Sequence, residues 1–207
     1  GTVLRAVREA FPAQAALTAV LLAREGVAGF EAPLEGRAGF YALYAGGAFS
    51  ADDLADRLGA HFWGTELTFK PWPSCRGTHP FIEMALDLRG RHGFAPAEVA
   101  GIDVEVDEVQ QMLVDPLERK QAPAVAIDAK FSIPFTTALA LTKGGVGLDD
   151  FGAGTLADQQ VLALSALVRP RTVQAPAWQR GTGGAMSIRL RDGTLLEAMV
   201  PDALGCP

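Results

Sequence analysis

A short stretch at residues 69–80 contains the side chains best suited to chemistry. It places Lys70, Ser74, Arg76 and His79 within ten residues, on a loop stiffened by prolines that leads into the predicted start of a helix. Free backbone N–H groups and the positive end of the helix dipole attract anions at such a terminus, and the two cations would add to that attraction. His79 could exchange protons near neutral pH. The spacing therefore predicts a site for a carboxylate or phosphate ligand.

The same residues also have ordinary structural interpretations, which the spacing leaves open. Lys70 and Arg76 could be solvated surface charges, and His79 could simply cap its helix. Cys75 is interpreted as a small apolar residue rather than a nucleophile, because the sequence positions no second histidine or acid beside it. Trp72 stands between two prolines and is predicted to be a packing residue.

The composition and charge of the chain restrict the class of protein. Of its 207 residues, 49% are hydrophobic and 20% are charged, which is typical of a soluble globular protein with ample material for a core. The 18 Lys and Arg residues against 24 Asp and Glu give a net charge of -6, which disfavours nucleic acid as a partner. The longest nearly apolar stretch, residues 15–23, is far shorter than the roughly 20 residues of a membrane-spanning helix, so no membrane partner is expected.

The spacing of cysteine and histidine residues argues against disulfides and metal ions. Cys75 and Cys206 are separated by most of the chain, and the three histidines are scattered without metal-ligand spacing. The N-terminus lacks the basic, apolar and small-residue pattern of an export signal. We therefore expect a cytoplasmic protein without a bound metal.

The first third of the chain is expected to be helical. Residues 3–25 have apolar side chains at helical spacing, with Pro12 as a kink or break, and a shorter helix is expected over residues 51–58. The second half of the first helix is apolar nearly all round, which predicts burial among other helices. Because this segment has more apolar surface than it can bury itself, we expect another chain to cover it, in a homo-oligomer or with a complementary N-terminal helical subunit.

Beyond residue 62, the pattern predicts both strands and helices. Residues 65–69 alternate weakly, and residues 101–107 alternate strictly, as a strand with one buried face does. Asp192-Gly193, between two apolar runs at residues 186–190 and 195–200, predicts a hairpin. Helices are expected from residue 79 through residue 88, over residues 131–143 and over residues 156–167.

Together, these elements predict an α+β fold with two parts. Residues 1–62 are expected to be a helical segment of a larger all-α domain. Residues 63–207 are expected to form a small α+β domain with a mainly antiparallel or mixed sheet covered by helices.

Three ordered stretches resemble the MmgE/PrpD family of dehydratases, decarboxylases and epimerases. Residues 13–40 are similar to the family's helix, glycine and "LEG…GF" segment. Residues 70–79 contain Lys-Pro-aromatic-Pro-x-Cys followed four residues later by His, and residues 129–140 resemble the family's "FSxPY" helix. The resemblance extends over nearly the whole chain.

The resemblance implies a helical domain and a smaller α+β domain, with the active site in the cleft between them and no metal or organic cofactor. The implied substrates are small di- or tricarboxylic acids. They would lose a proton next to a carboxylate and then lose water or carbon dioxide, or be reprotonated. Such chemistry needs cations that hold carboxylates and stabilise the developing enolate-like charge, together with a suitable base.

The motif match assigns catalytic roles to two residues of the 70–79 loop. Lys70 would act as a carboxylate clamp or proton donor, and His79 as a proton-transfer or substrate-positioning group. Ser74 and Arg76 are expected to bind substrate because they lie close to both in the sequence.

Two further candidates for substrate binding stand where the sequence departs from the family pattern. Many relatives carry a lysine ahead of the first helix, whereas this chain has Arg5, which keeps the charge but is a poor proton shuttle. Phe135 stands where the family often has Tyr and lacks the hydroxyl that could donate a proton. Plain core packing is the favoured interpretation of Phe135.

The enzymes of the family are longer than this chain and have an N-terminal helical region with further catalytic groups. We therefore expect the C-terminal half of a cofactor-independent lyase, which acts with a partner chain. The alternatives are a non-catalytic carboxylate-binding or scaffolding subunit of the same fold, and an epimerase or isomerase branch of the family.

Overall fold

The computed structural model describes residues 4–48, 50, 52, 55–174, 178 and 182–206. The chain divides into two compact units, residues 1–66 and residues 67–207. The sequence placed this division between residues 62 and 63. The candidate loop at residues 70–79 belongs to the second unit.

The described residues of the N-terminal unit include three helices and one 3₁₀ turn. They are α1 (Leu4–Val7), α2 (Ala10–Arg24), α3 (Phe40–Tyr44) and η1 (Trp63–Glu66). The predicted first helix is broken at residues 8 and 9, so Pro12 lies in the first turn of α2, where its missing N–H leaves no hydrogen bond unmade. The helix predicted over residues 51–58 includes residues 51, 53 and 54, which lie outside the described residues.

Helix α2 is apolar and buries none of its side chains within this unit. Its 15 residues include one charged side chain, Arg24, at the C-terminal end. Phe11, Leu17 and Val20 are among its large side chains that remain about half exposed or more. The described residues of this unit therefore provide α2 with none of the interior packing that normally stabilises such a helix.

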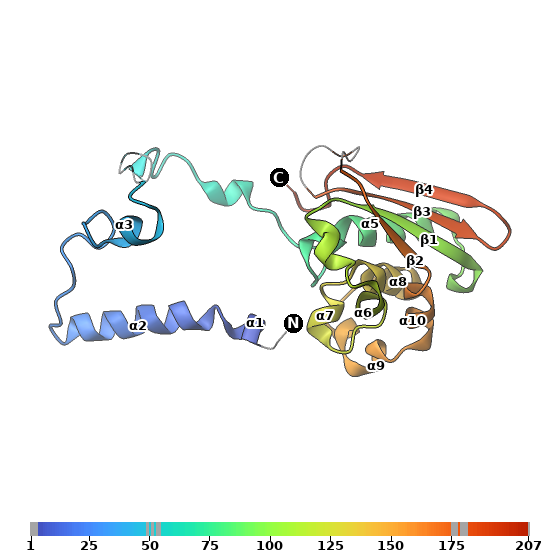
Figure 1. Cartoon of the computed structure of the whole chain (residues 1–207), viewed down its shortest axis with the longest axis horizontal. Coiled ribbons are helices and arrows are strands. Elements are labelled where there is room, and N and C mark those ends of the chain that lie inside the picture. The colour runs from blue at the N-terminus through green and yellow to red at the C-terminus, as the bar shows by residue number, and fades with distance from the viewer. Residues whose placement is uncertain are drawn as a thin grey trace. The chain divides into compact units, whose positions relative to one another are not determined.

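The second unit is built on a four-stranded mixed sheet (Figure 1). Its strands are β1 (Val99–Val106), β2 (Val168–Thr172), β3 (Gly184–Leu190) and β4 (Leu195–Val200), in the spatial order β2-β1-β3-β4. Strand β1 pairs parallel with β2 and antiparallel with β3, and β3 pairs antiparallel with β4. The predicted α+β fold with a mixed sheet is confirmed.

Local signals explain β1 and the hairpin. In β1, Ile102, Val104 and Val106 are fully buried and alternate with side chains on the other face. In the turn between β3 and β4, Gly193 adopts a φ of 93°, and Asp192 accepts a hydrogen bond from the Thr194 amide at 2.8 Å.

The structure differs from the predicted strands at two places. Residues 65–69 form no strand; residues 63–66 form the 3₁₀ turn η1 instead, and the Phe69 amide donates to the Gly205 carbonyl at 2.9 Å. Strand β2 was not predicted, because it is short, contains Pro170 and pairs with β1 across a long intervening helical segment.

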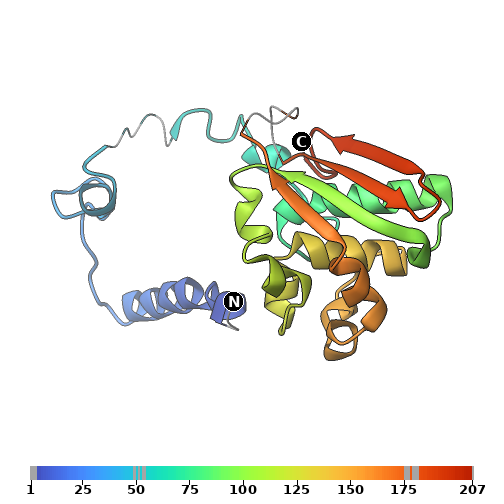
Figure 2. The ribbon, with the colours of Figure 1, turned by 45° about the vertical axis from the view of Figure 1, so that its right-hand side comes forward.

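Helices cover one face of the sheet, as Figure 2 shows for α5 and α8. The described helices of this unit are α5 (His79–His92), α6 (Leu117–Gln121), α7 (Ala126–Ala129), α8 (Ile133–Lys143), α9 (Ala153–Leu156) and α10 (Gln159–Ser165). The helix predicted over residues 156–167 is interrupted, because Asp158 caps a new helix at α10. The core between sheet and helices includes Phe81, Phe135 and Ile188, all fully buried.

Short 3₁₀ turns connect these elements and hold the candidate site. They are η2 (Arg76–Thr78), η3 (Pro96–Glu98), η4 (Gln110–Leu113) and η5 (Asp149–Phe151). Turn η2 leads directly into α5, and η4 follows the end of β1. Among the helices that the structure describes, none is both long and apolar enough to cross a membrane.

Candidate functional site

The loop at residues 70–79, here called the site loop, is fixed to the rest of its unit through its backbone. The Cys75 amide donates to the Lys130 carbonyl at 2.8 Å, just ahead of α8. The Thr78 amide and hydroxyl both donate to the Cys75 carbonyl, at 2.9 and 2.8 Å. These bonds shape η2 and place His79 at the first turn of α5, with Pro80 beside it.

Lys70 and Ser74 meet within this loop, but only the lysine is exposed. The Lys70 ammonium donates to the Ser74 carbonyl at 3.3 Å. The side chain of Ser74 is 5% exposed, and its hydroxyl lies 2.7 Å from that of Thr78. Because the Thr78 hydroxyl already donates to Cys75, Ser74 is the donor in this pair. Ser74 therefore has no proton left to donate to a ligand.

His79 is buried near the Lys70 charge and is neutral at physiological pH. Its side chain is 1% exposed, and its ring meets the Trp72 ring edge to face at 5.3 Å. Burial, with the nearby Lys70 charge as the next cause, lowers the pKa of His79 to about 4, although hydrogen bonds to the Ser74 and Trp72 carbonyls oppose this shift.

The hydrogen bonds of His79 define which ring nitrogen carries the proton. Its Nε2 is buried and has no hydrogen-bond partner among the described residues. The bonds to the backbone carbonyls of Ser74 and Trp72 therefore belong to Nδ1–H. This tautomer leaves the Nε2 lone pair as an acceptor, and it makes His79 a hydrogen-bond or proton acceptor rather than an acid at pH 7.

Arg76 is held by the C-terminal segment. Its guanidinium donates to the Cys206 sulfur at 3.0 Å and lies 3.9 Å from a carboxylate oxygen of Asp202. The Cys206 thiol in turn donates to Asp202 at 2.9 Å. Burial raises the pKa of Cys206, and the Cys206 hydrogen bond lowers the pKa of Asp202. Arg76 thus has an evident structural partner, which none of the sequence signals indicated.

The two remaining sequence candidates lie in the core of the second unit and in the N-terminal unit. Phe135 is fully buried in the core of its unit, as the packing interpretation predicts, so its side chain cannot reach a ligand at the surface. Arg5 lies in α1 of the N-terminal unit, and its side chain is outside the described part of the structure.

Lys120 is a cation near the site loop that the sequence reasoning missed. Its ammonium donates to the Phe131 carbonyl at 2.7 Å, next to the Lys130 carbonyl that binds the Cys75 amide. Burial lowers the pKa of Lys120, while the charges of Asp128 and Cys75 oppose that shift. Its neighbours Glu118 and Arg119 give the segment the pattern of a solvated charged face, so no local signal marks Lys120.

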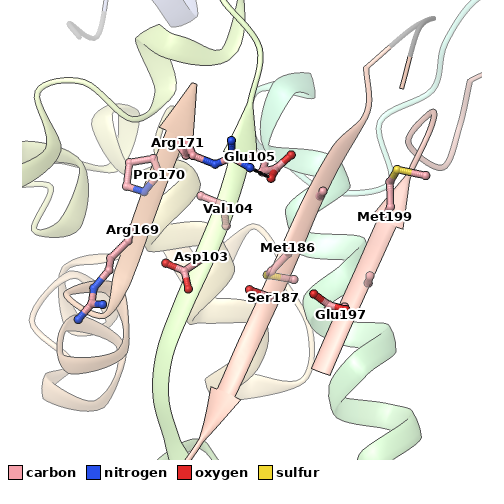
Figure 3. Close-up of a pocket in the computed structure, with 12 residues that line it drawn as sticks. Asp103, Val104, Glu105, Arg169, Pro170, Arg171, Met186, Ser187, Glu197 and Met199 are labelled. Atoms are coloured by element: carbon pink, nitrogen blue, oxygen red, sulfur yellow. Dashed lines mark hydrogen bonds and ion pairs between the residues drawn. The ribbon is translucent and has the colours of Figure 1, made fainter. Parts of the chain in front are cut away.

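The uncovered face of the sheet has a shallow depression of about 560 Å³ (Figure 3), but none of the predicted site residues lines it. Figure 3 shows Glu105 on β1 and Arg171 on β2 pointing toward one another, and the two form an ion pair. Asp103 lies 4.0 Å from Arg189 on β3. Because these charges are paired across strands, this face has the character of a solvated sheet surface.

Within the described ranges, no three His, Cys, Asp or Glu side chains gather as metal ligands. The second unit is thus an α+β domain in which helices cover one face of a mixed sheet. A loop with cationic side chains leads into one of these helices, which is largely buried. The family model of the MmgE/PrpD C-terminal domain matches residues 72–207. The chain therefore belongs to the MmgE/PrpD family, and the resemblance seen in its sequence is confirmed. No curated protein sequence matches the chain.

Proposed function

We propose that this chain is the C-terminal portion of a cofactor-independent MmgE/PrpD-type lyase and that its site loop binds a carboxylate of a small di- or tricarboxylic acid. The observation that carries the proposal is that one loop holds an exposed Lys70 ammonium and a buried, neutral His79 whose pKa the lysine charge helps to lower. The family includes dehydratases and related enzymes, which is consistent with this chemistry.

Lys70 supplies the positive charge in the proposed reaction. An ammonium has three N–H donors, of which the Ser74 carbonyl uses one, so the others can hold a substrate carboxylate. When a proton leaves the carbon next to that carboxylate, negative charge grows on the carboxylate oxygens. A fixed ammonium stabilises this charge more in the transition state than in the ground state.

Lys120 provides a second cation for a substrate with more than one carboxylate. It is half-buried near Cys75, and its lowered pKa reflects partial removal from water. Electrostatic attraction between an ammonium and a carboxylate strengthens as water is excluded. Two separated ammonium groups favour a di- or tricarboxylate over a monocarboxylate.

His79 contributes an acceptor in this proposal. With Nδ1–H donated to backbone carbonyls, its Nε2 is directed to accept a hydrogen bond or a proton from substrate or water. Because His79 is 1% exposed, ligand binding must move the groups that cover the ring for Nε2 to be reached.

A non-catalytic carboxylate-binding or scaffolding subunit is the second candidate. The observation that favours it is the burial of the proton-transfer groups: Ser74 donates its only hydroxyl proton to Thr78, and His79 is covered. In that case Lys70 would bind an anion and no proton would be moved.

Exchange of carbon-bound protons in deuterated water separates these functions. The full chain, alone and with a candidate N-terminal helical subunit, is incubated with a panel of di- and tricarboxylates, and exchange next to each carboxylate is followed by proton NMR. Exchange followed by loss of water or carbon dioxide supports the lyase, and exchange with only inversion supports an epimerase. Saturable binding without exchange supports the non-catalytic subunit, and the absence of both binding and exchange contradicts carboxylate binding.

A further inference from the structure

Gln110 is a buried side chain outside the site loop that ties this loop to the end of the sheet. It begins η4, directly after β1, and is 2% exposed. We propose that Gln110 is a positioning residue, which holds η2 and the adjoining Ser74 and His79 in the geometry needed for ligand binding. The inference rests on the proposed carboxylate-binding function of the site loop.

The amide of Gln110 joins three segments that are distant in sequence. Its Nε2 donates to the Gly183 carbonyl at 2.8 Å, at the start of β3, and to the Gly77 carbonyl at 3.3 Å, within η2. Its Oε1 accepts from the Asp107 amide at 3.1 Å, and its own backbone amide donates to the Asp107 carboxylate at 2.7 Å. Both amide protons and the amide oxygen are therefore in use, which neither Glu nor Met could reproduce.

The packing around these bonds leaves η2 little freedom to move. A side chain on Gly77 would place its Cβ 2.6 Å from a methyl carbon of Leu113 and 3.5 Å from Cγ of Gln110, so η4 rests directly on the backbone of the turn. A Cβ on Gly183 would lie 2.5 Å from the Trp178 ring. Both acceptor carbonyls thus belong to glycines in tight contact with their surroundings.

The position of Gly77 determines that of the functional groups beside it. Gly77 lies two residues ahead of His79 and three residues after Ser74, whose carbonyl holds the Lys70 ammonium. Loss of the Gln110 amide would leave the buried Gly183 carbonyl and the partly buried Gly77 carbonyl without their donor, and the turn would shift to satisfy them with water. Such a shift would hydrate His79 and displace the anchor of Lys70.

The variant Gln110→Met keeps the length and volume of the side chain but removes its donors and its acceptor. The matched control is Gln121→Met, because the Gln121 amide also donates to two backbone carbonyls, those of Ala166 at 3.3 Å and Val168 at 3.0 Å, outside the site loop. Both variants of the full chain are first compared with the unmodified protein by circular dichroism.

The first measurement is the protonation of the His79 ring at pH 5.5, followed by NMR of labelled histidine. His79 is neutral at this pH in the unmodified protein, since its pKa is about 4. In Gln110→Met we expect hydration to raise the pKa by about one unit or more, so that the ring becomes partly protonated, whereas Gln121→Met leaves it neutral.

The second measurement is calorimetric titration with citrate as the probe. We expect Gln110→Met to raise Kd about tenfold, the change that corresponds to losing one hydrogen bond, and Gln121→Met to leave Kd unchanged. Unchanged His79 protonation and unchanged Kd in a folded Gln110→Met protein would overturn the inference and reduce Gln110 to a structural support. If the unmodified protein binds neither citrate nor any other member of the panel of di- and tricarboxylates, the proposed function is contradicted, while the protonation of His79 still tests the positioning role.

The variant Gln110→Glu keeps the inference testable if Gln110→Met does not fold. It retains an oxygen for the Asp107 amide and regains one donor when the carboxyl is protonated. We expect its His79 signal to approach that of the unmodified protein as the pH falls from 7 to 5. If the His79 NMR signal of Gln110→Glu differs from that of the unmodified protein at both pH 7 and pH 5, a role for the amide donors is contradicted.

Discussion

Two groups that can carry positive charge lie side by side in the site loop, and their surroundings separate their roles. Lys70 is exposed, whereas burial and the Lys70 charge keep His79 neutral. The pair therefore presents one cation and one uncharged acceptor. A carboxylate ligand would meet the cation first, and its arrival would offset the effect of Lys70 on His79.

Replacing Lys70 tests whether this cation binds the ligand. We expect Lys70→Ala to weaken carboxylate binding by about 1.5–3 kcal/mol, the range for a hydrogen bond to a charged group. Isothermal titration with a dicarboxylate that the unmodified protein binds measures the change in binding free energy. Lys143→Ala, which removes an exposed lysine at the end of α8, is the control. Equal affinities in Lys70→Ala and the unmodified protein would return Lys70 to a solvated surface role.

The lowered pKa of His79 predicts a stability that depends on pH. Between about pH 6.5 and pH 4, the unfolded chain binds a proton at His79 and the folded chain does not, so stability falls as the pH decreases through this window. The full effect is about 3 kcal/mol. Urea unfolding at pH 7 and at pH 4.5 should show a smaller difference for His79→Gln than for the unmodified protein.

His92→Gln is the control for this measurement, because His92 lies in the last turn of the same helix and is exposed. It should leave the pH dependence unchanged. If His79→Gln and His92→Gln give equal pH dependence, His79 is not the group that titrates.

The sequence predicted that Lys70, Ser74 and His79 would lie close together, because residues within a loop of ten residues cannot be far apart. It could not predict which of them would be buried. Burial of His79 depends on Trp72, and Lys120 reaches the same region from a segment more than forty residues further along the chain. Contacts of that range leave no periodic signal in a single sequence.

Among the elements, α8 and the segment ahead of it support the site loop. Ser132 caps α8 by accepting from the Phe135 amide at 3.0 Å, and its hydroxyl donates to the Lys120 carbonyl at 2.5 Å. One buried hydroxyl therefore joins the start of α8 to α6. The Lys130 carbonyl, two residues earlier, holds the Cys75 amide.

Removing this hydroxyl should loosen the joint between α6 and α8. We expect Ser132→Ala to lower the free energy of unfolding by about 2 kcal/mol, because it removes a cap and leaves a buried carbonyl without its donor. The matched variant Asp158→Ala removes the cap of α10, which accepts from the Gln160 amide at 2.9 Å near the surface, and should cost about 1 kcal/mol. Urea denaturation compares the two, and a smaller loss in Ser132→Ala than in Asp158→Ala would contradict the buried role.

The strand with strict alternation and the hairpin with a turn signal were predicted correctly, whereas β2, which depends on distant pairing, was not. The alternation at residues 101–107 and the Asp192-Gly193 turn gave β1 and the hairpin. Strand β2 owes its existence to its parallel register with β1, from Ile102 opposite Val168 to Val106 opposite Thr172. The weak alternation at residues 65–69 found no partner strand and formed none.

For the whole molecule, the main unexplained feature is the exposed apolar surface of the N-terminal unit. Helix α2 buries no side chain within its own unit, yet it consists almost entirely of apolar residues. A helix of this composition is normally stabilised by packing against other helices. We propose that it is covered by a second copy of this chain or by a complementary helical subunit.

Light scattering tests this association on the full chain. We expect a mass greater than that of the monomer, and we expect Leu21→Glu to reduce it because a carboxylate would have to be buried on α2. Leu148→Glu, which changes an exposed leucine of the second unit, should leave the mass unchanged. A monomer of the unmodified protein with α2 freely exchanging its amide hydrogens would refute the proposal.

The β2 edge of the sheet is unsuited to association through an added strand. Strand β2 is one of the two edge strands, and Pro170 at its centre removes a backbone donor while Arg169 and Arg171 flank it with charge. If β2 of a second copy paired with this edge, the hydrogen-bond ladder would be incomplete at Pro170. The arginines of the two copies would also repel one another. Polymerisation by strand addition is therefore blocked on this side. Even at high concentration, the chain can associate through its exposed helices. Its sheet does not extend into a fibre from the β2 edge.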